Sequence, residues 1–126
     1  MSKLSLFILF LITTTQYNCG PSFNYSEEGI ASYYSDILHG RVTASGDIYN
    51  RDSLTAAHKD LPLGTKVLVT NLQNQKSIWV TINDRGPYIK ERIIDLSKRA
   101  ADSLDMIRPG IAPVKIESYI EDYKLD

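Results

Sequence analysis

Apolar and polar residues alternate along several short segments of this 126-residue chain, with turn-forming residues between them. The clearest pair of segments covers Lys66–Asn71 and residues 77–82, where valine and isoleucine recur at every second position. A period of two residues predicts β-strands that bury one face. Residues 72–76 between them suit a hairpin connection, in which we expect Asn74 to take a positive φ.

Further strands and one helix complete the pattern. We expect strands at residues 93–96 and 114–120, the second of which follows Pro113. Between them, the spacing of apolar residues predicts a helix that is capped by Ser97 and ends before Pro109. The residues on its apolar face are Ala100, Ala101 and Leu104. Many short strands with turn signals between them predict a mainly β fold, a sandwich or a barrel, in one domain.

The first residues of the chain form a separate segment. Lys3 precedes mostly apolar residues 4–12, a run that is shorter than the roughly 20 residues of a membrane-spanning helix. This pattern is typical of a secretory signal peptide, which we expect over residues 1–18. The single cysteine, Cys19, stands at the expected cleavage point and has no internal disulfide partner. We therefore expect lipidation of Cys19, with an incidental cysteine after a plain signal peptide as the alternative.

Residues 19–28 are polar and show no periodicity, which predicts a short lipidated tether before a folded domain at 29–126. An extended tether of this length reaches about 30 Å, so the domain would stay close to a membrane on the extracytoplasmic side of the cell envelope. The formal net charge is −1, which gives no indication of the basic face that nucleic acid requires. We also expect a monomer.

The strongest chemical signal is the segment Asn83-Asp84-Arg85-Gly86-Pro87. It places an aspartate and an arginine at the end of an apolar strand and directly before a tight turn, which is how scaffolds hold reactive groups rigidly. Such segments also form ordinary turns, in which the aspartate accepts hydrogen bonds from nearby backbone amides. The pentapeptide alone leaves both interpretations open.

Further segments accompany this motif in a fixed order along the chain. They cover residues 29–34, 39–47, 54–58, 61–65, 69–72, 92–97 and 100–101. In this order the chain resembles the rare lipoprotein A family, bacterial peptidoglycan lytic transglycosylases, from Gly29 to about Ile120. The resemblance implies a six-stranded double-psi β-barrel with one or two short helices and no cofactor. It implies an endolytic enzyme that cleaves MurNAc–GlcNAc glycan strands in cell wall remodelling or septation.

The resemblance also assigns catalytic residues. Such an enzyme protonates the oxygen between two sugars and lets the 6-hydroxyl of muramic acid attack, so one carboxyl group can act first as acid and then as base. The residue at the position of this acid is Asp84. His58 and Asp47 match the other two implicated positions, although glutamate is usual at the second. From the residues alone, His58 could instead bond to backbone in its loop, and Asp47 could be a turn residue after Gly46.

Asp95 lies at a position that resembles the acid of barrel-related cellulases and expansins, and capping of the following helix is its alternative role. Arg85 is expected to point to the opposite side of the strand from Asp84. It could therefore serve a structural role, pair with Asp95, or meet a carboxylate of the ligand. The other residues that we expect to line the substrate groove are Tyr34, Thr43 and Tyr88.

Two histidines, His39 and His58, are far apart in the sequence and lack zinc-ligand spacing, so we expect no metal site. A second class of function stays open: a non-catalytic glycan-binding or scaffold lipoprotein of the cell envelope, because expansin-like relatives bind polysaccharide on this barrel. Asp47 in place of glutamate, and an expected lack of the glycan-binding repeat domain of many family members, favour this alternative. The presence of Asp84, His58 and Asp95 together favours the enzyme.

Overall fold

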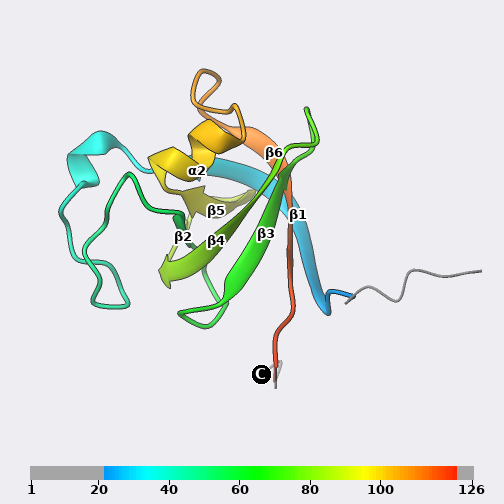
Figure 1. Cartoon of the computed structure of the whole chain (residues 1–126), viewed down its shortest axis with the longest axis horizontal. Helices are drawn as coiled ribbons and strands as arrows, with labels where there is room; N and C mark the ends of the chain where they lie inside the picture. The colour runs from blue at the N-terminus through cyan, green and yellow to red at the C-terminus, as the bar shows by residue number, and fades with distance from the viewer. Residues whose placement is uncertain (1–21, 122–126) are drawn as a thin grey trace, which may run out of the picture.

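Strands close into a barrel over residues 22–121, the part of the chain that the computed structural model describes (Figure 1). The strands are β1 Tyr25–Tyr33, β2 Thr55–Ala57, β3 Lys66–Asn71, β4 Ser77–Asp84, β5 Arg92–Leu96 and β6 Ala112–Ser118, and the helices are η1 Asp36–Leu38 and α2 Lys98–Ser103. Around the barrel the strand order is β1-β5-β2-β4-β3-β6. β1 pairs with β5 and β2 with β4 in parallel, and the other neighbours are antiparallel.

The barrel interior is filled by alternate residues of the strands. Val67 and Val69 of β3 and Val80 and Ile82 of β4 are buried, because successive side chains of a strand point to opposite faces. The helix α2 packs against β1, β4 and β5, and Leu104 at its end belongs to the same hydrophobic cluster. The polar faces of the strands are left at the barrel surface, as the two-residue pattern predicts.

The main elements predicted from the sequence are confirmed. β3 has the expected bounds, β4 extends to Asp84, and α2 begins after Ser97, whose side chain accepts a hydrogen bond from the Ala100 amide. β6 starts at Ala112, so Pro113 lies inside the strand and not before it. It is the second residue of the strand, a position near an end where the missing N–H is tolerated.

Two local predictions are wrong. The positive φ in the β3–β4 hairpin belongs to Gln75 (63°) and not to Asn74. The Asn74 side chain accepts a hydrogen bond from the Lys76 amide and donates one to the Leu104 carbonyl, so it closes an Asx turn instead. β1 begins at Tyr25, and residues 25–28 of the expected tether pair with β6. Ser26 and Glu28 of this stretch are exposed, and Tyr25 and Glu27 are half-buried.

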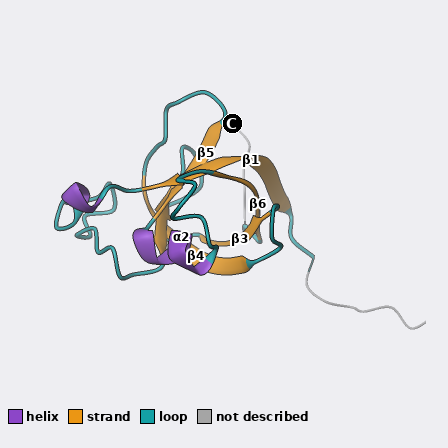
Figure 2. Ribbon diagram, turned by 90° about the horizontal axis from the view of Figure 1, so that it is seen from above, coloured by secondary structure: helices purple, strands orange, loops and turns teal. Residues whose placement is uncertain are grey.

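The chain between β1 and β2 forms a lobe, residues 34–54, that projects from one side of the barrel in both views (Figures 1 and 2). It contains η1 and a narrow hairpin closed by a bridge between Val42 and Ile48. At the tip of this hairpin, the Ser45 amide donates to the Asn83 carbonyl at 3.1 Å. The lobe therefore docks onto the end of β4.

The expected signal peptide, residues 1–18, and Cys19 lie outside the described residues. Within residues 22–121, no helix combines the length and apolar character that a bilayer crossing requires.

Candidate active site

The Asp84 carboxylate is held between two segments that are distant in sequence. Asp84 is the last residue of β4, and its Oδ2 accepts a hydrogen bond from the Tyr34 hydroxyl at 2.5 Å. Its Oδ1 accepts one from the backbone amide of Ala44, in the lobe hairpin, at 2.9 Å. Gly86 follows with a φ of 117°, a conformation that favours glycine. The strand end, the tyrosine and the lobe together fix the orientation of this carboxylate.

A cavity of about 110 Å³ opens beside Asp84. Its lining residues are Tyr34, Leu38, Arg41, Val42, Thr43, Tyr49 and Asp84. The structure thus brings Asp84 together with Tyr34 and Thr43, two of the residues predicted to bind substrate. Tyr49 was not predicted; it is buried and meets the Tyr34 ring edge-on at a centroid distance of 4.6 Å. Only its place in the sequence, close after the Ser45-Gly46-Asp47 turn, could have indicated it.

The two tyrosines of the cavity are kept in their neutral form. Burial raises the pKa of Tyr34 far above its usual range, and the hydrogen bond to Asp84 raises it further, followed by the negative charges of Asp84 and Asp95. Burial also raises the pKa of Tyr49. The Tyr34 hydroxyl therefore stays a hydrogen-bond donor to Asp84 throughout the physiological pH range.

Asp47 lies in the lobe hairpin, with an exposed side chain. Its carbonyl oxygen accepts hydrogen bonds from the amide and the hydroxyl of Thr43, at 2.7 and 2.9 Å. Among the described residues, nothing bonds to its carboxylate. Asp47 thus forms the turn that the sequence suggested, and it is not among the residues that line the cavity beside Asp84.

Asp95 is not a helix cap, because Ser97 caps α2 alone. Its carboxylate accepts hydrogen bonds from the Ser32 hydroxyl and from the Arg92 guanidinium, the latter at 2.5 Å. The possible pairing of Asp95 with Arg85 is therefore wrong. Tyr88, after the Gly-Pro turn, is 76% exposed and does not line the cavity beside Asp84.

Arg85 binds backbone. Its Nη1 donates to the Leu61 carbonyl at 2.8 Å and to the His58 carbonyl at 3.3 Å. The guanidinium therefore ties the turn after β4 to the loop after β2, a structural role that the sequence left open. In this state Arg85 is not directed at the cavity beside Asp84.

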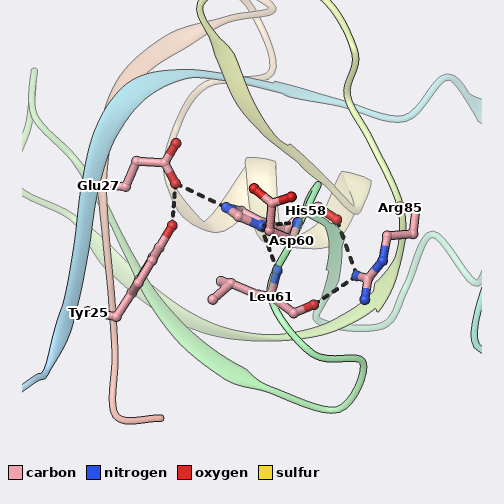
Figure 3. Close-up of polar contacts among 6 residues, drawn as sticks. All are labelled: Tyr25, Glu27, His58, Asp60, Leu61 and Arg85. Carbon is pink, nitrogen blue, oxygen red and sulfur yellow. Dashed lines mark hydrogen bonds and ion pairs between the residues drawn. The ribbon is translucent and has the colours of Figure 1, made fainter. Parts of the chain in front are cut away.

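The His58 ring is buried and has partners at both nitrogens. Nε2 lies 3.1 Å from Oε2 of Glu27, and Nδ1 accepts hydrogen bonds from the amides of Asp60 and Leu61 at 3.0 and 3.1 Å (Figure 3). His58 is hydrogen-bonded to Asp84 through the backbone, by a 3.1 Å bond from its amide to the Asp84 carbonyl. Glu27 was not predicted as a site residue, because it lies in the segment expected to be a tether.

Across residues 22–121 there is no group of three or more histidine, cysteine, aspartate or glutamate side chains placed to hold a metal ion. The cavity beside Asp84 presents this oriented carboxyl group together with tyrosine, threonine, arginine and aliphatic side chains.

A family model described as lytic transglycolase, a double-psi β-barrel domain, matches residues 26–116. The chain belongs to the lytic transglycolase family. The match begins in β1 and ends in β6, so it includes every strand of the barrel. The expectation of a six-stranded double-psi β-barrel is confirmed.

Relatives within the lytic transglycolase family are similar over most of this chain. It is 48% identical over 103 residues to the endolytic peptidoglycan transglycosylase RlpA of Campylobacter jejuni, which covers 82% of this chain and 38% of the relative. It is 55% identical over 93 residues to the protein of the same name from Pasteurella multocida, with coverage of 74% and 32%. The chain therefore spans about a third of the length of these relatives.

Solved structures with the same barrel are more distant. The Streptomyces papain inhibitor aligns with a TM-score of 0.62 at 22% identity, over 80% of this chain and all of the inhibitor. An expansin from Clavibacter michiganensis aligns with a TM-score of 0.59 at 21% identity, over 79% of this chain and 52% of the expansin. At these identities the likeness shows the fold alone.

Proposed function

We propose that this chain is an endolytic lytic transglycosylase that cleaves peptidoglycan glycan strands between MurNAc and GlcNAc, leaving 1,6-anhydro-muramoyl ends. The observation that carries the proposal is the Asp84 carboxylate, fixed by Tyr34 and Ala44 at the edge of a cavity that Thr43 and Tyr49 also line. The names of the relatives, endolytic peptidoglycan transglycosylases, support the same substrate and reaction.

The reaction needs one carboxyl group in two protonation states. Asp84, as the acid, gives its proton to the glycosidic oxygen while positive charge builds on the anomeric carbon of the muramic acid. The bond from that carbon to the oxygen breaks, and the 6-hydroxyl oxygen of the same sugar forms the new bond to the carbon. The Asp84 carboxylate, now the base, takes the hydroxyl proton, so water does not enter the reaction.

The neighbours of Asp84 suit this cycle. Tyr34 stays protonated and can donate to the carboxylate formed in the first step, which stabilises the base that the second step needs. Thr43 and Tyr49 supply polar and aromatic surface for a sugar ring in the cavity. Asp47, with its exposed carboxylate, is proposed to reach the bound glycan from the lobe, and Asp95 to act through its charge on Tyr34.

We further propose that the protein is a monomer of the cell envelope, anchored to a membrane by a lipid on Cys19. The apolar segment before Cys19 and the lack of a second cysteine for a disulfide support this anchor.

The test is incubation of the full chain, purified in detergent, with isolated sacculi, followed by mass spectrometry of the released glycans. Anhydro-muramoyl ends are the expected product. Reducing ends would instead identify a hydrolase. Binding to sacculi without any release would identify the glycan-binding or scaffold protein that the sequence left open.

A further inference from the structure

The hydrogen-bond partners of the His58 ring select one tautomer. Two amides, those of Asp60 and Leu61, donate to Nδ1. A proton on Nδ1 would meet both N–H groups, so Nδ1 carries none and Nε2 carries the ring proton. That Nε2–H group donates to Oε2 of Glu27, which also accepts a hydrogen bond from the Tyr25 hydroxyl at 2.5 Å (Figure 3).

This tautomer holds the loop after β2. The His58 side chain stabilises the turn at residues 58–61, because Nδ1 accepts hydrogen bonds from the amides of the third and fourth residues of this turn. The turn presents two carbonyls, those of His58 and Leu61, to Nη1 of Arg85. Figure 3 shows the ring between Glu27 on one side and the Arg85 guanidinium on the other.

The same contacts end at Asp84. Arg85 follows Asp84 directly in the chain, and the His58 amide donates to the Asp84 carbonyl at 3.1 Å. β2 and β4 pair in parallel here, with Ala57 opposite Asp84. The backbone of Asp84 is thus fixed from the loop side by His58 and Arg85, while its carboxylate is fixed from the lobe side by Tyr34 and Ala44.

We propose that Glu27 and His58 are positioning residues for Asp84: Glu27 holds the ring in place by accepting the Nε2–H group, and His58 orders the turn that anchors Arg85 and the end of β4. The proposal rests on the transglycosylase function proposed above. It gives His58 a role without proton transfer, since neither ring nitrogen is free to meet a substrate. It also adds Glu27, a residue of β1, to the machinery of the site.

The rate of a reaction depends strongly on the position of its catalytic groups, so the positioning of Asp84 can be tested by kinetics. A displacement of about 1 Å at a catalytic group can lower a rate about a hundredfold. Loss of the His58 contacts should therefore lower the rate of cleavage and leave binding to glycan unchanged, because Asp84 and the cavity residues are still present.

Two substitutions test the contacts of Nδ1 and of Nε2 separately. His58→Asn places Oδ1 near the position of Nδ1, so it can accept the amides two and three residues ahead as an Asx turn does, but it cannot titrate. His58→Gln can keep an N–H near the Nε2 position for Glu27, but it has no acceptor near Nδ1. We expect His58→Asn to retain at least about a third of the wild-type rate and His58→Gln to lose about tenfold or more.

Glu27→Ala removes the partner of Nε2 and should lower the rate about three- to tenfold, which is less than the roughly hundredfold loss that a displacement of about 1 Å causes. Glu28→Ala is the matched control, because Glu28 is the next residue of β1 and is exposed. It should have the wild-type rate. All variants should pellet with sacculi as the wild type does, and their melting temperatures identify any variant that fails to fold.

Amide hydrogen exchange at Asp60 and Leu61, followed by NMR on the full chain, measures whether the hydrogen bonds of the turn are kept, independently of activity. Exchange should be about tenfold faster or more in His58→Gln and should stay close to the wild-type rate in His58→Asn, since an unpaired amide opens to solvent. The proposal is overturned if these amides are unaffected in His58→Gln. It is also overturned if His58→Asn keeps their protection and yet cleaves no glycan, because His58 would then do proton chemistry. A wild-type chain that releases no anhydro ends would refute the proposed function, while the exchange rates would still decide the role of the ring.

Discussion

Removal of the Tyr34 hydroxyl is predicted to slow glycan cleavage while the fold is kept. Tyr34→Phe deletes the 2.5 Å hydrogen bond to Oδ2 of Asp84 and leaves the ring against Tyr49. A hydrogen bond to a charged group contributes about 1.5–3 kcal/mol. If that energy acts on the transition state, in which Asp84 is passing into its carboxylate form, the rate falls by about 10- to 150-fold.

The assay for Tyr34→Phe is the initial rate of anhydro-muramoyl release from sacculi, with Tyr119→Phe as the control. Tyr119 is 63% exposed and lies outside the cavity beside Asp84, so its variant should match the wild type. Thermal unfolding should show that Tyr34→Phe is folded, because the ring still fills its place. A folded Tyr34→Phe protein with the wild-type rate would refute the reasoning, since Asp84 would then need no donor from this side of the cavity.

Three more predictions follow from the same structure. Asp47→Glu should raise the rate of anhydro release, and Asp47→Ala should lower it. The reason is that one methylene extends an exposed carboxylate by about 1.5 Å, which is more than the roughly 0.5 Å that an active site tolerates. Equal rates in all three proteins would show that Asp47 is a turn residue only. Cys19→Ala should leave the membrane fraction or stay uncleaved, as judged by fractionation, and continued membrane association after cleavage would require another anchor. The free energy of unfolding should fall above about pH 10, the pKa of tyrosine in the unfolded chain. Folding raises the pKa of Tyr34, so the stability that Tyr34 contributes is complete below the pKa of the unfolded chain. This stability is lost as the pH rises toward the pKa of the folded protein. Urea unfolding at pH 9 and 11 should show a smaller fall for Tyr34→Phe than for the wild type, and an equal fall would contradict the cause given for the shift.

The barrel could be predicted in large part from the sequence because its strands bury one face. The period of two residues in β3 and β4 and the capped apolar face of α2 are local signals, and both elements are where the pattern placed them. The start of β1 was missed because Tyr25 to Glu28 carry no such alternation. Their pairing with β6 is a contact between segments far apart in the chain, which no local pattern reports.

The candidate site, too, could be predicted only in part from the sequence. The consecutive strand, acidic residue and Gly-Pro turn drew attention to Asp84, and the resemblance gave it the role of the acid; Tyr34 and Thr43 were expected to line the groove. The partners that give these residues their environment could not be recognised. Ala44 reaches Asp84, and Tyr49 lines the cavity beside it, only because the lobe folds back on β4, and Glu27 meets His58 from another strand. Arg85 likewise found backbone carbonyls as partners, for which no sequence pattern exists.

The most direct test of the account is the Asp84→Asn variant on purified sacculi, measured by mass spectrometry of the released glycan ends. Asparagine keeps the shape of the side chain and removes the proton that the reaction transfers. Asp102→Asn, at an exposed position of α2, makes the same chemical change away from the site. The account predicts anhydro-muramoyl ends from the wild type and from Asp102→Asn, and none from a folded Asp84→Asn protein. Substantial release of anhydro ends by Asp84→Asn would contradict it and direct attention to Asp95.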